Sequence, residues 1–363
     1  MSSKDVPKYV QENYNVVAEI AKGKFGVVYR CTEKATNSFV AIKVMKGRHN
    51  KKDDVEREVA IMRQLSHPNI LQFIDYVPDK TSYILVTELL NGGELFDYCV
   101  TKDYVEEAEA VFFMKQILSG LEYMHKRDIC HLDLKPENIV LKDESAKELK
   151  IIDFGTCQHL TKDKAVKALA GTPEFVAPEV LNYDPVTCAA DMWAIGVIAF
   201  CLLTGCSPFL GDNDAETIQN VTEGEFEFPE SDPEEGYDDI TDAAKDFISS
   251  LLISDPRKRL TSIDAQEHKW INGSTSQAAR INTERLKKLR RRRKLLAAIQ
   301  AVRLSVGLLR SFTRHGSVSV EPAPDRRMTE PSIRLSTPPS SAPATNPGSF
   351  MANGSASYKL HVS

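Results

Sequence analysis

The residues that could carry chemistry are concentrated between positions 131 and 155. The octapeptide at 131–138 reads His-Leu-Asp-Leu-Lys-Pro-Glu-Asn, and Asp153-Phe-Gly follows after a gap of 14 residues. Phosphoryl transfer needs a carboxylate for the attacking hydroxyl, a cation for the transferred group and oxygen ligands for magnesium. The spacing predicts Asp133 in the first role and Lys135 in the second. Asn138 and Asp153 would bind Mg2+.

A glycine-rich turn lies near the N-terminus, between two segments with strand character. It reads Ala21-Lys-Gly23-Lys-Phe-Gly26-Val-Val28. Glycines permit a tight hairpin whose backbone amides can close over phosphates. A dinucleotide site of the dehydrogenase type would need a helix after the turn, whereas a strand follows here. An ordinary hairpin stays an alternative, because Ala21 stands where phosphate-covering turns usually have their first glycine.

A lysine and a glutamate further along have the spacing of an ion pair beside a nucleotide. Lys43 ends the strand-like run Val40-Ala41-Ile-Lys43, and Glu58 follows 15 residues later on a predicted helix. Lys43 is either a solvated strand residue or the cation for the α- and β-phosphates. Glu56 competes poorly for Lys43, because two positions earlier it points to a different side of the helix. We therefore expect Lys43 to pair with Glu58.

Sequence patterns place a small β-rich part before a larger α-rich part. Runs of β-branched and apolar residues predict strands, and apolar residues three or four positions apart predict helices. Asp53 or Asp54 is expected to cap the N-terminus of the helix that carries Glu58. The predicted strands are Tyr14–Ile20, Gly26–Cys31, Phe39–Met45 and Ser82–Thr87, and the predicted helices are Asp53–Leu65, Ala110–His125 and Asp191–Leu203.

Three later motifs complete a characteristic order. They are Gly171-Thr-Pro-Glu-Phe-Val-Ala-Pro-Glu179, Asp191-Met-Trp-Ala-Ile-Gly196, and Arg259 within Asp-Pro-Arg-Lys-Arg-Leu. With the preceding motifs, this order resembles the eukaryotic protein kinase family over residues 14–271. The resemblance implies an α+β, two-lobed protein kinase fold, with a small β-rich N-lobe, a large α-helical C-lobe and ATP between them. It also implies a buried structural ion pair between Glu179 and Arg259.

The resemblance implies in addition how the chain would hold ATP and Mg2+. Backbone groups of Glu88 and Leu90 would bind adenine, and Thr87 would stand at the back of the adenine pocket. Lys135, two places after Asp133, is typical of kinases that phosphorylate serine and threonine. The positions implied around the nucleotide are Ala21, Gly23, Gly26, Val28, Ala41, Lys43, Thr87, Glu88, Leu90, Glu94 and Asp153.

Two acids match positions that often recognise basic residues of a protein substrate. Glu94 follows a glycine pair, and Glu137 lies within the octapeptide. Each could equally be a solvated acid, and we favour substrate recognition. An alternative for the whole chain is a pseudokinase scaffold, which keeps the fold without turnover. That alternative is disfavoured because Ala21 is the only departure near the phosphates, and the catalytic set Lys43, Glu58, Asp133, Lys135 and Asn138 is complete.

One position within the octapeptide departs from the family pattern. Leu132 replaces the usual arginine, which would gather a phosphate on the activation segment and order it. Leucine cannot bind a phosphate. We therefore expect activity without an activation-segment phosphate, so that Thr161→Ala leaves activity intact.

Finer motifs resemble the calmodulin-dependent group, in particular the death-associated protein kinases and the myosin light-chain kinases. They include Gly-Gly-Glu-Leu-Phe-Asp at 92–97 and Gly-Cys-Ser-Pro-Phe-Leu-Gly-Asp at 205–212. This likeness implies a role in apoptosis or in the phosphorylation of myosin regulatory light chain. The basic loop typical of death-associated kinases is missing, since residues 48–53 are only a short polar connection. A homodimer or partner assigned through that loop is therefore in doubt.

A basic segment over residues 280–312 follows the kinase-like region. The chain carries a net charge of −5, but residues 280–310 hold eleven Lys or Arg and one acid, so this stretch is +10 and the remainder −15. Apolar residues in it form one helical stripe next to the arginines of 290–294, as in calmodulin targets. The predicted anchors are Leu295, Ile299, Val302 and Leu308.

We interpret this segment as an autoregulatory helix that docks on the acidic large lobe, obstructs the substrate cleft and is extracted by Ca2+/calmodulin. Ser305 lies inside the stripe, and a phosphate there would oppose calmodulin binding. A membrane-surface helix, a nuclear-localisation or nucleic-acid patch and a short coiled coil are alternatives. A calmodulin-independent kinase with a targeting helix is thus the competing interpretation, and specific nucleic-acid binding is not expected.

Composition limits the remaining classes. No apolar run of 18 residues predicts a transmembrane helix, and the N-terminus lacks a signal region. Seven scattered cysteines are typical of reduced thiols. We expect a cytoplasmic protein with possible links to the cytoskeleton. Residues 1–13 form a polar lead, and the Ser- and Pro-rich residues 313–363 are predicted to be disordered.

Overall fold

The computed structural model describes most of the first three hundred residues. The described ranges are 6–23, 26–48, 50–145, 147–161, 166–167, 171–230, 239–273 and 279–296, with residue 298. The chain divides into two units, Met1–Arg303 and Leu304–Ser363, and every described residue belongs to the first unit. The predicted anchors Ile299, Val302 and Leu308, the phosphorylation candidate Ser305 and the predicted tail from residue 313 lie outside the described residues.

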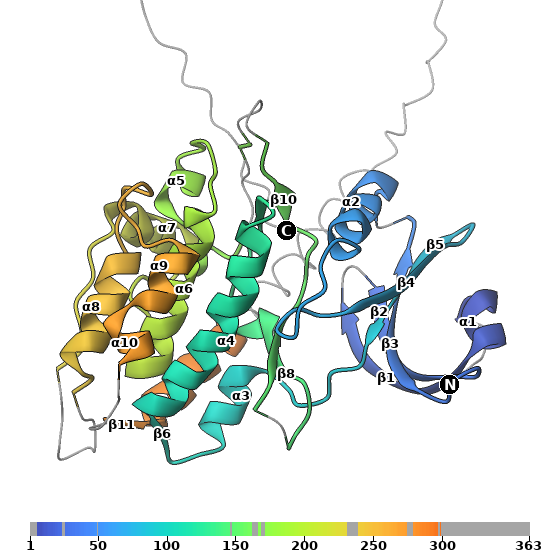
Figure 1. Cartoon of the computed structure of the whole chain (residues 1–363), viewed down its shortest axis with the longest axis horizontal. Helices are drawn as coiled ribbons and strands as arrows, with labels where there is room; N and C mark the ends of the chain where they lie inside the picture. The colour runs from blue at the N-terminus through green and yellow to red at the C-terminus, as the bar shows by residue number, and fades with distance from the viewer. Residues whose placement is uncertain are drawn as a thin grey trace, which may run out of the picture. The chain divides into compact units, whose positions relative to one another are not determined.

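A five-stranded antiparallel sheet forms the small lobe, in the order β1-β2-β3-β5-β4 (Figure 1). Two packed apolar clusters support it, one around Ile42 and Ile84, the other around Met45 and Leu85. Successive side chains of a strand point to opposite faces, so β3 contributes to both clusters. The strands are β1 (Tyr14–Gly23), β2 (Gly26–Glu33), β3 (Phe39–Lys46), β4 (Phe73–Pro78) and β5 (Ser82–Glu88).

The small lobe also contains two helices, α1 (Lys8–Asn13) and α2 (Lys52–Met62). Helix α2 buries the face that carries Val55, Glu58 and Val59, as its spacing predicts. The predicted N-cap is wrong. The cap residue is Lys51, which has extended backbone angles and no side-chain cap hydrogen bond. The two aspartates instead lie in the first turn, where their charge favours the positive end of the helix dipole.

The large lobe is mainly helical and has one extensive apolar core. Helix α6 (Ala189–Thr204) is buried all round, as expected for a helix without a polar face, and Trp193 is fully buried in it. The other helices are α3 (Leu95–Val100), α4 (Glu107–His125), α5 (Pro178–Leu181), α7 (Asp214–Glu223), α8 (Asp242–Leu251), α9 (Ser262–Glu267) and α10 (Lys269–Asn272). The described residues thus confirm the predicted two-lobed α+β fold.

Short elements in and beside the large lobe place the catalytic loop. Strand β7 (Ile129–Cys130) precedes that loop and pairs with β10 (Gln158–His159), and η2 (Pro136–Asn138) leads into β8 (Ile139–Leu141). Strand β8 pairs with β9 (Leu149–Ile151), which runs into Asp153. The 3-10 turn η3 is Pro173–Phe175. Because strand pairing holds the elements on both sides of the loop, its polar side chains have fixed positions.

The implied ion pair between Glu179 and Arg259 is present inside the large lobe. The guanidinium donates to both carboxylate oxygens, each over 2.7 Å. Arg259 also donates to backbone carbonyls, among them Ile253 O at 2.6 Å, and its guanidinium lies over the Trp193 ring. All donors of a buried charge need such partners, since desolvation is expensive.

The basic segment begins as part of the large lobe. Strand β11 (Arg280–Asn282) pairs with β6 (Tyr104–Glu106), and a helix then spans 284–296. Leu286 and Leu289 of this helix are buried in the lobe's core. Leu295, the first predicted calmodulin anchor, is 62% exposed. Its exposure leaves that side chain accessible from outside the lobe.

The seven cysteines are free thiols, and five of them are buried. Among the described residues, none of the helices combines the length and the apolar character needed to cross a bilayer.

Candidate active site

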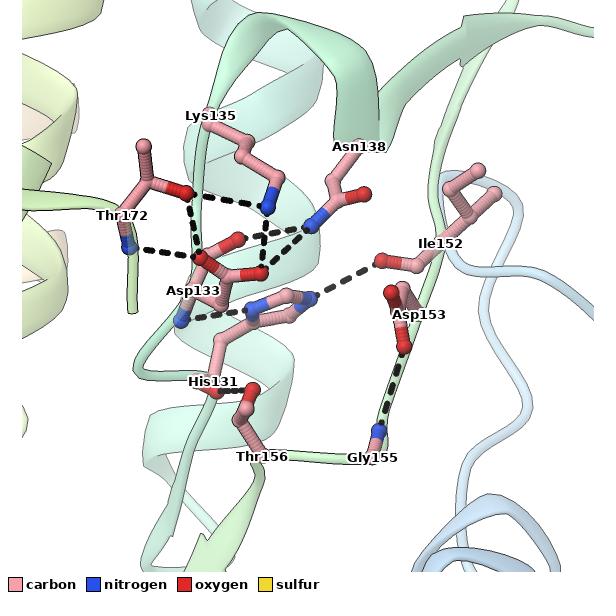
Figure 2. Close-up of polar contacts among 9 residues, drawn as sticks. All are labelled: His131, Asp133, Lys135, Asn138, Ile152, Asp153, Gly155, Thr156 and Thr172. Atoms are coloured by element: carbon pink, nitrogen blue, oxygen red, sulfur yellow. Dashed lines mark hydrogen bonds and ion pairs between the residues drawn. The ribbon is translucent and has the colours of Figure 1, made fainter. Parts of the chain in front are cut away.

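Asp133 is the centre of a dense polar network on the catalytic loop (Figure 2). Lys135 Nζ lies 2.7 Å from Asp133 Oδ2, and Asn138 Nδ2 donates to the Asp133 carbonyl over 2.7 Å. From the segment before η3, Thr172 donates its N–H and its hydroxyl to Asp133 Oδ1, over 3.1 and 3.3 Å. The structure therefore brings Asp133, Lys135 and Asn138 together, as their spacing predicts.

His131 ties this loop to the segment that carries Asp153. Its Nε2 donates to the carbonyl of Ile152 over 3.0 Å, and its Nδ1 accepts from the N–H of Asp133 over 3.3 Å. The hydroxyl of Thr156 donates to the His131 carbonyl over 3.0 Å. Donation at one nitrogen and acceptance at the other fit a neutral imidazole. His131 thus sets the spacing between the catalytic carboxylate and Asp153 (Figure 2).

Asp191, on α6, binds the backbone of the catalytic loop. Its two carboxylate oxygens accept from the N–H groups of His131 and Leu132, over 2.8 and 2.9 Å. His125 Nε2 lies 2.9 Å from the same carboxylate. Burial would raise the pKa of Asp191, but the His125 and backbone hydrogen bonds lower it below the ordinary value. Sequence reasoning placed Asp191 in a motif without a role, and only the fold shows its partners.

Asp153 and Asn138 are suited to hold magnesium. Asp153 adopts a left-handed backbone with φ +65°, which Asp tolerates better than most residues, and its Oδ1 accepts from Gly155 N at 3.4 Å. Asn138 turns its amide nitrogen toward Asp133, which leaves its carbonyl oxygen for a cation (Figure 2). Carboxylate and amide oxygens are the donors that Mg2+ prefers, so the residues present fit this ion.

The predicted ion pair between Lys43 and Glu58 is formed. Lys43 Nζ on β3 lies 3.5 Å from Glu58 Oε1 on α2. A Cβ atom built on Gly155 would be 3.5 Å from Asp153 Oδ1 and 3.7 Å from Glu58 Oε2. The two carboxylates therefore face the same glycine. This arrangement brings Lys43, the predicted phosphate-binding lysine, to the neighbourhood of Asp153, the predicted metal ligand.

The glycine-rich turn joins β1 and β2, with Gly23 paired to Gly26. Residues 24 and 25 at its tip lie outside the described part. A Cβ atom on Gly26 would lie 2.4 Å from Val44 O, whereas one on Gly23 would meet nothing within 4 Å. Gly26 is thus required by the close approach of β3, a reason that the sequence does not reveal. Ala21 pairs with Val28 within the hairpin.

The implied adenine-binding residues lie at the end of β5 and in the connection after it. Thr87 is 7% exposed and donates its hydroxyl to the carbonyl of Glu88 over 3.2 Å. The Glu88 side chain turns to Lys150 of β9, whose Nζ is 2.6 Å from Glu88 Oε1. Sequence reasoning did not predict Lys150, because nothing in its local context distinguishes it from a surface lysine.

The two predicted substrate acids share one acidic neighbourhood. Glu94 is the N-cap of α3, and burial together with the charges of Asp97 and Glu137 raises its pKa. Lys294 and Arg290 act in the opposite direction on the same pKa. Cations of the 284–296 helix are therefore close to these acids. The sequence predicted these acids and the docking of the basic segment on the acidic lobe, but not which of its cations would lie beside them.

These features define an enzyme that transfers a phosphoryl group from a nucleotide. Residues 14–271 match the protein kinase domain family, and the chain belongs to it. It is a serine/threonine protein kinase of the calmodulin-dependent group, which uses ATP and Mg2+.

Two relatives place the chain within the group. It is 41% identical over 320 residues to death-associated protein kinase 2 of Mus musculus, an alignment that covers 84% of this chain and 85% of that protein. It is 40% identical over 326 residues to smooth muscle myosin light chain kinase of Gallus gallus. That match covers 89% of this chain but only 17% of the larger protein.

A solved structure supports the same placement. A twitchin kinase fragment of C. elegans, described as an autoregulated protein kinase with immunoglobulin domains, superposes with a TM-score of 0.73 at 38% identity. The match covers 79% of this chain and 64% of that one.

Proposed function

We propose that this kinase phosphorylates Ser or Thr near basic residues of proteins, is inhibited by its own basic segment and is activated by Ca2+/calmodulin. The observation that carries the proposal is the seat of Arg293, by which we mean the group of residues that its guanidinium contacts. Arg293 Nε and Nη2 contact the two carboxylate oxygens of Glu174 over 3.1 and 2.5 Å. Only 12% of its side chain is exposed. Such a bidentate, largely buried pair is among the stronger polar contacts in proteins.

Aromatic and sulfur atoms complete this seat. The guanidinium lies 5.0 Å from the Phe175 ring and 5.9 Å from the Phe96 ring, and Nη2 is 3.3 Å from Cys201 Sγ. Glu174 comes two residues after Thr172, which contacts the catalytic Asp133. The seat therefore adjoins the place where a phosphoacceptor must approach.

Neighbouring arginines of the same helix form ion pairs with other acidic residues. Arg290 pairs with Asp97, and Arg292 pairs with Asp212 over 2.7 Å and donates to the Gly211 carbonyl over 3.0 Å. A substrate with basic residues would need the acids that this helix already covers. The contacts therefore support direct competition between the helix and such a substrate.

Calmodulin would act from the opposite end of the segment. The exposed Leu295 is the first apolar anchor of the predicted calmodulin stripe, and it follows directly on Arg290–Lys294. Calmodulin encloses such anchors in Met-rich grooves and complements basic charge with its acidic surface. Binding of calmodulin to the chain from Leu295 onward would separate the arginines from the acidic residues with which they pair, while Leu286 and Leu289 can stay in the core.

Full-length charge variants test the inhibitory contact. Arg293→Ala removes about 1.5–3 kcal/mol of charge-assisted bonding, which shifts the docking equilibrium on the order of 10- to 100-fold. Activity toward a basic peptide without calcium should rise toward the calmodulin-stimulated level. Arg291→Ala is the matched control, because Arg291 carries the same charge on the exposed side of the helix. Equal, low basal activity in both variants would refute the inhibitory seat.

A second variant separates calmodulin binding from inhibition. Leu295→Asp changes an exposed side chain, so basal activity should stay low while affinity for calmodulin falls. Titration of fluorescent calmodulin with the full-length variant measures this. Unchanged affinity would remove Leu295 from the calmodulin site.

The names of the relatives suggest substrate and location. One relative is a smooth muscle myosin light chain kinase and another is a titin homolog, so we infer myosin regulatory light chain as a candidate substrate and the cytoskeleton as a candidate location. Phosphate transfer to purified light chain, compared with a basic reference peptide, tests the substrate.

A further inference from the structure

A buried lysine outside the catalytic set connects the two lobes. Lys150 lies on β9, and its side chain is 8% exposed. Its Nζ contacts Glu88 Oε1 over 2.6 Å and the Ile70 carbonyl over 3.2 Å. Glu88 ends β5, at the segment predicted to bind adenine through its backbone, and Ile70 precedes β4. A single ammonium group therefore contacts both the end of β5 and the segment that leads from α2 into β4.

The Glu88 end of this contact is firmly held. Its Oε1 also accepts from the N–H of Gln72 over 2.7 Å, and its own N–H donates to the Gln72 carbonyl over 3.1 Å. Because one carboxylate oxygen accepts from a backbone amide and an ammonium group, the start of the adenine-binding segment has little freedom relative to β9. Charge-assisted bonds of this length are stronger than neutral ones.

The other end of β9 leads to the metal-binding residues. Ile151 pairs by backbone with the segment before β4, through Ile151 N to Asn69 O at 2.9 Å and Leu71 N to Ile151 O at 3.0 Å. Ile152 N then donates to the Asn138 carbonyl over 3.0 Å. Asp153 follows. Only two residues therefore separate Lys150 from Asp153, the carboxylate predicted to hold magnesium.

We propose that Lys150 is a positioning residue, which through Glu88 fixes the distance between the adenine-binding segment and the magnesium site at Asp153. ATP must bind the adenine-binding segment and the magnesium site at the same time, since its adenine contacts the first and its metal-bound phosphates contact the second. Two linked contacts bind tightly only when their spacing matches the ligand. Without the lysine, each end can still bind its own part of the nucleotide, but the correct spacing is rarely populated.

The test compares a ligand that spans both ends with one that occupies a single end. Lys150→Met removes the charge and keeps an unbranched side chain that is one atom shorter. In the full-length protein, the Kd of Mg·ATP should rise about tenfold, while the inhibition constant of adenosine changes by less than about twofold. Calorimetry measures the first and competition against ATP in a kinase assay the second. Lys150→Arg, which keeps the charge, should restore part of the ATP affinity.

Controls keep the outcome specific. Lys142→Met removes a cation from the same β8–β9 hairpin, where Lys142 pairs with Glu148 in solvent over 2.8 Å, and both affinities should stay unchanged. If Lys150→Met does not fold, Lys150→Met with Glu88→Gln leaves no uncompensated charge and permits the same comparison. Equal losses for ATP and adenosine would overturn the proposal, because the adenine site itself would be damaged. Unchanged affinity for both would also overturn it.

Discussion

The backbone N–H of Leu132 donates to Asp191 Oδ1 over 2.9 Å, while Leu132 itself adopts a left-handed φ of +65°. Such a conformation is costly for a branched side chain, and it persists only where surrounding contacts impose it. The Asp191 carboxylate supplies one of those contacts and orients the loop that presents Asp133. A buried charge on α6 therefore contributes to the shape of the catalytic loop.

Asp191→Asn should lower both stability and turnover. An amide keeps the shape but loses the charge that faces His125, and breaking a buried pair costs about 3–5 kcal/mol. Urea unfolding should show a loss of unfolding free energy in this range. The kcat should fall because the N–H of Leu132 then donates to a neutral amide oxygen instead of a charged carboxylate. Asp246→Asn is the control, since Asp246 forms a similar pair with His268 at the surface over 3.2 Å. Equal losses in the two variants would contradict the prediction.

The His125–Asp191 pair predicts how stability varies with pH. Burial lowers the pKa of His125, but the hydrogen bond and charge of Asp191 raise it overall above the ordinary value of about 6.5. A raised pKa means that the folded state binds the proton more tightly. The stabilisation is therefore complete below about pH 6.5 and is lost as pH rises through the folded pKa.

Urea midpoints of the wild type and of His125→Gln measure this dependence. Their difference should be largest near pH 6 and should shrink at higher pH. Asp191, whose pKa is lowered, contributes stability above its ordinary pKa and loses it as pH falls through the folded value. A difference between the two proteins that does not vary from pH 6 upward would refute the protonated pair.

The sequence predicted the parts of the site that depend on residue type and spacing. Asp133, Asn138 and Asp153 stand in short motifs, and Lys43 with Glu58 follows from the strand and helix patterns. Their contacts extend over few residues or over two neighbouring elements. Local pattern and adjacent packing are therefore enough to predict them.

The remaining contacts depend on tertiary structure. Arg293 meets Glu174 from 119 positions away, and Lys150 meets Glu88 across the lobes. The sequence indicated that the basic segment would dock on an acidic lobe, but not which arginine would be buried. A row of five basic residues offers no local signal for the one that faces inward. Only the orientation of the 284–296 helix, set by its buried leucines, selects it.

Gly26→Ala should destabilise the small lobe, whereas Gly23→Ala should not. The added Cβ at Gly26 would lie 2.4 Å from the Val44 carbonyl, and that oxygen belongs to a paired strand that cannot move freely. Overpacking of this kind costs about 1–3 kcal/mol. The same methyl on Gly23 meets open space. Thermal unfolding of the two variants gives the comparison, and equal melting temperatures would show that β3 can yield.

Ser305→Asp should weaken calmodulin binding. A phosphate brings about −1.5 to −2 charges into a basic, apolar stripe, and an aspartate imitates part of that effect. Titration of the full-length variant with fluorescent calmodulin should show lower affinity than wild type. Ser305→Ala serves as the control, because it leaves the side chain uncharged. Equal affinity of the two variants for calmodulin would dispose of Ser305 as a regulatory site.

Thr161→Ala should leave kcat within about twofold of wild type, a change of under roughly 0.5 kcal/mol in the barrier. Leu132 is buried in the apolar core and offers no charge for a phosphate, so a phosphorylated Thr161 would gain no partner there. The activation segment has another attachment, because Val186 N donates to the Val166 carbonyl over 2.9 Å.

Thr172→Ala provides the contrast for this experiment. It removes a hydroxyl that contacts both Asp133 and Lys135, over 3.3 and 3.1 Å, so kcat should fall by about tenfold or more, the equivalent of one lost hydrogen bond to a charged group. Both variants exchange one threonine for alanine in the same segment. If Thr161→Ala lost as much activity as Thr172→Ala, a phosphate at position 161 would be needed after all, and another cation would have to replace the missing arginine.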